Sequence, residues 1–155
     1  MIQKFISLMY VFIMVFTILI KPELAIGDDK KIQMFVDQYK ALKVESDDLL
    51  KKIINVDMNK NITLDDMSSQ TLNAIKRINS FSEGIQEYSI DQQSRGKINT
   101  DDAHKILMVA NTADAMSQTL NVGINYLMMR KGIYLQTALK YREIWTFIER
   151  EAGIR

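Results

Sequence analysis

Among the neighbouring aspartates of this 155-residue chain, three pairs beyond residue 40 are the first feature that could support chemistry. Two carboxylates can share general acid and general base roles only when both face one reacting atom. Side chains of adjacent residues point about 100° apart around a helix, so adjacent aspartates are typical of helix starts and solvated faces. The pairs therefore do not predict a catalytic site; they are Asp47-Asp48, Asp65-Asp66 and Asp101-Asp102.

Other residue types that carry chemistry are scarce. The chain has no cysteine, which excludes disulfides, thiol nucleophiles and thiolate zinc sites, and its single histidine is His104. No nucleophile elbow or comparable local signature surrounds its serines. The formal net charge is +1 and no long run carries one sign, so nucleic acid is not an expected partner. We therefore expect a protein that is not an enzyme and has no resident cofactor, with calcium as the one ion to consider.

Two polar segments can be superimposed with an offset of 36 residues. Residues 61–66 fall on residues 97–102, both ending in a pair of aspartates, and Asn55 falls on Asp91. The segments 55–66 and 91–102 resemble a pair of EF-hand calcium loops, each lying between two helices. The resemblance covers about half of the chain.

The resemblance implies a calcium site in the first loop. Its oxygen ligands would be Asn55, Asp57, Asn59, the carbonyl of Asn61, Thr63 and Asp66. It also implies that Ile62 and Ile98 pair the two loops. The departures from the motif are Lys60 in place of the turn glycine, Asp66 in place of glutamate, and Gln93 and Arg95 at ligand positions of the second loop. The same residues are also typical of ordinary helix caps.

The first residues of the chain have the composition of an export signal. Lys4 precedes a nearly uniform apolar run at residues 5–20, which Lys21 and Pro22 end, and small residues follow at 25 and 27. This order predicts a signal peptide over residues 1–27 and one helical domain over 28–155. A membrane anchor at residues 5–20 is the alternative, although a helix of that length spans only about 24 Å. Either reading predicts an exported protein, periplasmic or secreted.

The remaining chain has the periodicity of amphipathic helices. From Asp29 to Ile54 an apolar row steps by three and four residues: Ile32, Phe35, Tyr39, Leu42, Ser46, Leu49, Ile53. A second helix is expected from Thr63 to about Ser89, with a less regular row: Leu72, Ile75, Ile78, Phe81, Ile85, Tyr88. The fold class is therefore all-α, an antiparallel bundle of three to four helices following the N-terminal apolar segment.

The most regular apolar row runs from Ile106 to Ile148 without losing its register. Its members are Ile106, Ala110, Ala113, Ser117, Leu120, Ile124, Leu127, Lys131, Tyr134, Ala138, Tyr141, Trp145 and Ile148. Arg130, Lys131 and Gly132 are typical of a helix end, which predicts that the chain folds back into a fourth helix there. One continuous helix in a coiled coil is the alternative.

A protein without a catalytic signature but with aromatic residues on such a row is expected to work by binding. We expect contacts with a protein partner or a second copy of the chain, made by Tyr134, Tyr141, Trp145 and Ile148. Membrane contact is expected only if the N-terminal segment is retained. A calcium-responsive module is the alternative, and a component of an envelope secretion assembly is a third, by analogy of composition alone.

Overall fold

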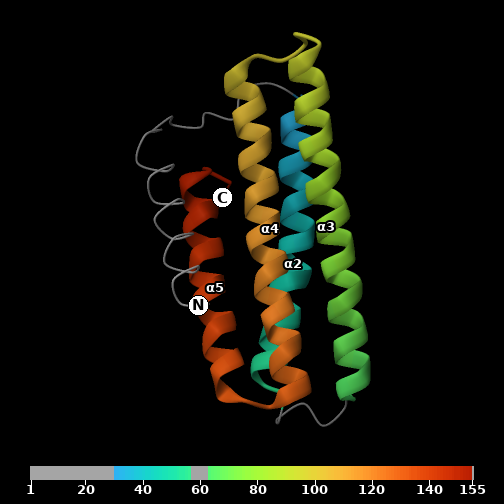
Figure 1. The fold of residues 1–155 in the computed structure, drawn as a ribbon, viewed down its shortest axis with the longest axis vertical. Coiled ribbons are helices and arrows are strands. Elements are labelled where there is room, and N and C mark those ends of the chain that lie inside the picture. The colour runs from blue at the N-terminus through green and yellow to red at the C-terminus, as the bar shows by residue number, and fades with distance from the viewer. Residues whose placement is uncertain (1–29, 57–62, 155) are drawn as a thin grey trace, which may run out of the picture.

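The computed structural model describes residues 30–56 and 63–154, and four helices make up this part of the chain. They are α2 (Lys30–Ile54), α3 (Leu64–Ser94), α4 (Thr100–Met129) and α5 (Gly132–Glu151). Helices that follow one another in the chain run antiparallel, with α4 between α3 and α5 and with α2 behind it (Figure 1). The predicted all-α bundle is confirmed, whereas the predicted signal or anchor segment lies outside the described residues. Within those residues no helix has the length and apolar character needed to cross a membrane.

Helix α4 is the centre of the bundle because it packs against each of the other three helices. Its buried residues surround most of its circumference and include the predicted row from Ile106 to Leu127. Asp114 is the one charged residue from Ile106 to Met129, so most of the helix has no charge to desolvate. A helix that is apolar on nearly all sides is stable only when other helices cover it.

Helices α3 and α4 meet through small and hydroxyl-bearing residues. Ser82 Oγ donates to the carbonyl of Ala110 and Ser89 Oγ to that of Ala103, each at 3.2 Å. The predicted row on α3 is therefore wrong in part: Leu72 is exposed, while the positions at the core are Met67, Thr71, Ala74, Ile78, Ser82, Ile85 and Ser89. Short side chains let the two backbones approach closely, and their hydroxyls are satisfied by the facing helix.

The chain turns between α4 and α5, which distinguishes the predicted fourth helix from the alternative of one continuous helix. Arg130 adopts the left-handed conformation (φ 53°), and its N–H donates to the carbonyl of Tyr126. The predicted break near Gly132 is confirmed, but the left-handed residue is Arg130 and not the glycine. Gly132 instead begins α5, after Lys131, which makes no side-chain cap.

Candidate interaction site on the last helix

The inner face of α5 is fixed to α2 by a buried hydrogen bond. The indole N–H of Trp145 donates to the hydroxyl of Tyr39 at 2.6 Å, and both side chains are buried. Ala138, two turns earlier on α5, is also buried. The periodicity that places Trp145 on the apolar row thus brings its polar atom to a partner, as a buried indole requires.

A charged pair lies beside this hydrogen bond. Glu149 is buried and accepts from the half-buried ammonium of Lys43, while the Tyr39 hydroxyl lies 3.4 Å from the same carboxylate oxygen. Burial raises the pKa of Tyr39 far above its ordinary value, and the negative charge of Glu149 acts in the same direction. The phenol therefore stays neutral. It accepts a hydrogen bond from the indole of Trp145 and donates one to the carboxylate of Glu149.

The four predicted contact residues lie at different depths. Trp145 is 2% exposed and Ile148 is half-buried against the core, so neither presents its side chain freely. Tyr134 and Tyr141 are half-buried. The structure therefore assigns Trp145 to the core, and the four residues do not form an exposed patch together.

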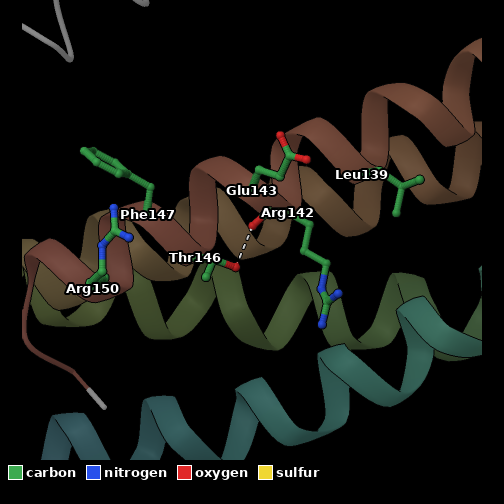
Figure 2. A pocket seen from close by; sticks show the side chains of 6 residues that line it. All are labelled: Leu139, Arg142, Glu143, Thr146, Phe147 and Arg150. Atoms are coloured by element: carbon green, nitrogen blue, oxygen red, sulfur yellow. Dashed lines mark hydrogen bonds between the residues drawn. The ribbon is translucent and has the colours of Figure 1, made fainter.

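The outer face of α5 carries apolar residues that the sequence analysis did not single out. Leu139 and Phe147 are exposed, at 39% and 36%. They border a shallow hollow whose described lining residues all come from α5: Leu139, Arg142, Glu143, Thr146, Phe147 and Arg150. Figure 2 shows the Phe147 ring pointing away from α2. The side of the helix away from its core contacts thus carries two large apolar side chains among polar and charged ones.

Charges surround these apolar residues. Arg142 points toward α2 and pairs with Asp47 at 3.0 Å, which ties one edge of the hollow to the bundle (Figure 2). The guanidinium of Arg150 lies 5.4 Å from the centroid of the Phe147 ring. Glu143 is exposed, so a carboxylate and a guanidinium seven residues apart flank the phenylalanine. An apolar centre with a charged rim is typical of protein contact surfaces.

The residues proposed as calcium ligands are only partly described. Asp57, Asn59 and Asn61 lie outside the described residues. The Asn55 amide donates to the carbonyl of Lys51, within its own helix turn. Thr63 is the N-cap of α3: its hydroxyl accepts from the N–H of Asp66 and donates to that carboxylate. The capping alternative describes Thr63 and Asp66 correctly.

The second polar segment is shorter than the resemblance implies. Helix α3 continues to Ser94, so the first part of segment 91–102 is helical and Asp91 pairs with Arg95. Asn99 caps α4 by accepting from the N–H of Asp102. The expectation that 91–102 is a loop is therefore wrong for residues 91–94, which belong to α3, whereas residues 95–99 form the connection between α3 and α4. Calcium binding by residues 55–66 stays a prediction.

Comparisons with known proteins add no assignment. Among the described residues, no group of three or more histidine and carboxylate side chains is arranged to hold a metal ion. No family model matches the chain, and no curated protein and no solved structure matches it either.

Proposed function

We propose that this chain is an exported helical binding protein that acts through protein contacts made by the outer face of α5. The observation that supports this proposal is that α5 exposes two large apolar side chains away from its core contacts. Its inner side is occupied by the contacts of Ala138 and Trp145, while Leu139 and Phe147 remain exposed on the other. Exposed apolar residues inside a rim of charges favour association with another surface.

A second copy of the chain is the first partner to consider, because this face is complementary to itself. In an antiparallel pair of α5 helices with a two-fold axis between Thr146 and Phe147, Glu143 of one copy lies opposite Arg150 of the other. The two-fold axis repeats that pair, so both charges on each copy are used. The same arrangement stacks the two Phe147 rings near the axis, where burial contributes most.

Analytical ultracentrifugation of the purified chain over a range of concentrations tests self-association. We expect Phe147→Ser to raise the dissociation constant of the dimer at least about tenfold. Val44→Ser, which removes another exposed apolar side chain from α2, serves as the matched control and is expected to change nothing. A chain that is monomeric at every concentration would reject self-association.

A charge exchange tests the geometry separately from the apolar contact. Glu143→Arg places like charges opposite each other and is expected to weaken the dimer, whereas Glu143→Arg combined with Arg150→Glu restores the pairs in reverse. Failure of the double variant to recover association would reject the antiparallel arrangement. Glu83→Arg, an exposed change of the same kind on α3, controls for net charge.

A further inference from the structure

The turn between α4 and α5 exposes large apolar side chains at one end of the bundle. We call residues 126–134 the hairpin tip; it lies at the lower end in Figure 1. Met128 is 71% exposed, Ile133 62% and Met129 53%. A convex turn cannot cover these side chains with its own backbone, so they are available to another phase or surface.

The sequence around the hairpin tip is basic and has no acidic residue. From Ala115 to Arg142 the charged residues are Arg130, Lys131, Lys140 and Arg142, all cations. Arg130 and Lys131 stand directly between the two methionines and Ile133 in the sequence. Asp65 and Asp66, in the first turn of α3, lie at the same end of the bundle, and Asp66 takes part in the helix cap.

The residue at the centre of the hairpin tip, Arg130, has a left-handed backbone conformation that glycine would adopt without strain. Among the described residues Arg130 is the one non-glycine residue with a positive φ. A left-handed residue at a helix end is usually glycine, because a Cβ costs free energy there. Strained backbone positions are concentrated at functional sites, which motivates a role for the Arg130 side chain.

Two tyrosines stand beside the exposed residues. Tyr126 and Tyr134 are half-buried, and the Arg130 guanidinium lies 5.8 Å from the centroid of the Tyr126 ring. Rings with one apolar and one polar end are typical of the boundary between hydrocarbon and lipid headgroups. The tip thus combines apolar side chains at its apex, cations among them and tyrosines behind them.

We infer that the hairpin tip is a contact site for an anionic phospholipid bilayer. Met128, Met129 and Ile133 enter the boundary between headgroups and acyl chains, and Arg130 and Lys131 remain at the level of the phosphates. A bilayer accepts a convex apolar tip without a preformed pocket, whereas a protein partner would need a matching cavity. This site uses a different surface from the outer face of α5, so the two proposals succeed or fail independently.

A fluorophore attached at the tip tests this inference on the full chain. The chain has no cysteine, so Met128→Cys allows an environment-sensitive dye to be attached at one position. Ile90→Cys, an exposed apolar position on α3, is the matched control, because α3 runs from the tip end toward the opposite end of the bundle. The readout must be local, since the apolar run at residues 5–20 can hold the chain on vesicles by itself.

We expect the dye at position 128 to shift to the blue with vesicles of equimolar phosphatidylglycerol and phosphatidylcholine, and not with phosphatidylcholine alone. The dye at position 90 should not respond. Lys131→Gln is expected to raise about fivefold the lipid concentration that gives half of the blue shift. Lys97→Gln, in the turn after α3, is expected to leave this concentration unchanged. Circular dichroism confirms that each variant is folded.

Three results would overturn the inference. One is an unchanged emission of the dye at position 128 when the protein sediments together with the vesicles. Another is an equal response to the neutral lipid, which would remove the role of the cations. The third is the same blue shift with polyglutamate in place of vesicles, which would identify an acidic polypeptide as the partner.

Discussion

The indole N–H of Trp145 and the hydroxyl of Tyr39 meet at 2.6 Å across 106 residues of sequence. This hydrogen bond joins α5 to α2, two helices whose backbones approach each other less closely than those of the other neighbouring pairs. It therefore gives α5 a fixed rotation about its axis. Together with the Arg142–Asp47 pair and the packing against α4, it holds the outer face of α5 in a defined orientation.

Tyr39→Phe is expected to lower the free energy of unfolding by about 1–3 kcal/mol, because the buried indole N–H loses its acceptor. Trp145→Ala, which also empties a buried site, should cost about 3–5 kcal/mol. Chemical denaturation measures both, and the double variant should cost less than the sum. Strict additivity would contradict coupling between the two side chains.

The raised pKa of Tyr39 predicts a loss of stability in alkali. The folded-state pKa lies above the unfolded value of about 10, so the unfolded chain loses this proton first. The contribution of the neutral phenol is thus complete below pH 10 and declines above it, by about 1.4 kcal/mol per pH unit. Denaturation between neutral and alkaline pH should show a shallower decline in Tyr39→Phe than in the half-buried control Tyr88→Phe. Identical declines in both variants would contradict this assignment.

Two glycines inside helices are expected to respond differently to alanine. Gly84 has open space around it, so Gly84→Ala should raise the free energy of unfolding by about 1 kcal/mol through helix propensity. A Cβ at Gly123 would lie 3.0 Å from Cδ1 of the buried Ile53. Gly123→Ala should therefore be about 1–3 kcal/mol less stable than Gly84→Ala. Ile53→Val should recover part of that difference, and equal stability of the two alanine variants would show that Ile53 moves freely.

Calcium binding by residues 55–66 is tested by titration. The resemblance predicts weak affinity, roughly 10⁻⁴–10⁻³ M, because Asp57 and Asp66 are the only carboxylates at ligand positions. Melting temperature and Trp145 fluorescence should rise or shift with calcium, and Asp57→Ala should abolish the change. Indifference to millimolar calcium would leave Thr63 and Asp66 with capping alone.

Processing of the N-terminus is tested by sequencing the protein from its native host. The apolar run at residues 5–20 and the small residues that follow predict a mature chain that begins at Asp28. An intact Met1 in the membrane fraction would favour the anchor, and a cytoplasmic protein would contradict export.

Local periodicity was sufficient to place most of the helices. The row from Ile32 to Ile53 predicted a helix at 29–54, and α2 spans Lys30–Ile54. Thr63 and the two aspartates that follow it likewise predicted the start of α3, which begins at Leu64. These features depend on neighbours within about four residues, so a sequence read alone contains them.

The packing depth of individual side chains was decided by tertiary structure. Ser82 and Ser89 are core residues because α4 supplies carbonyl acceptors at the facing positions. Phe147 was missed because apolar periodicity identifies only the face toward the core. A single apolar residue outside that row leaves the periodicity unchanged, so the pattern does not reveal it. Glu149 could not be predicted as buried, since its partner Lys43 lies 106 residues away. Which charges are satisfied and which apolar side chains remain exposed depends on pairs that only the folded chain brings together.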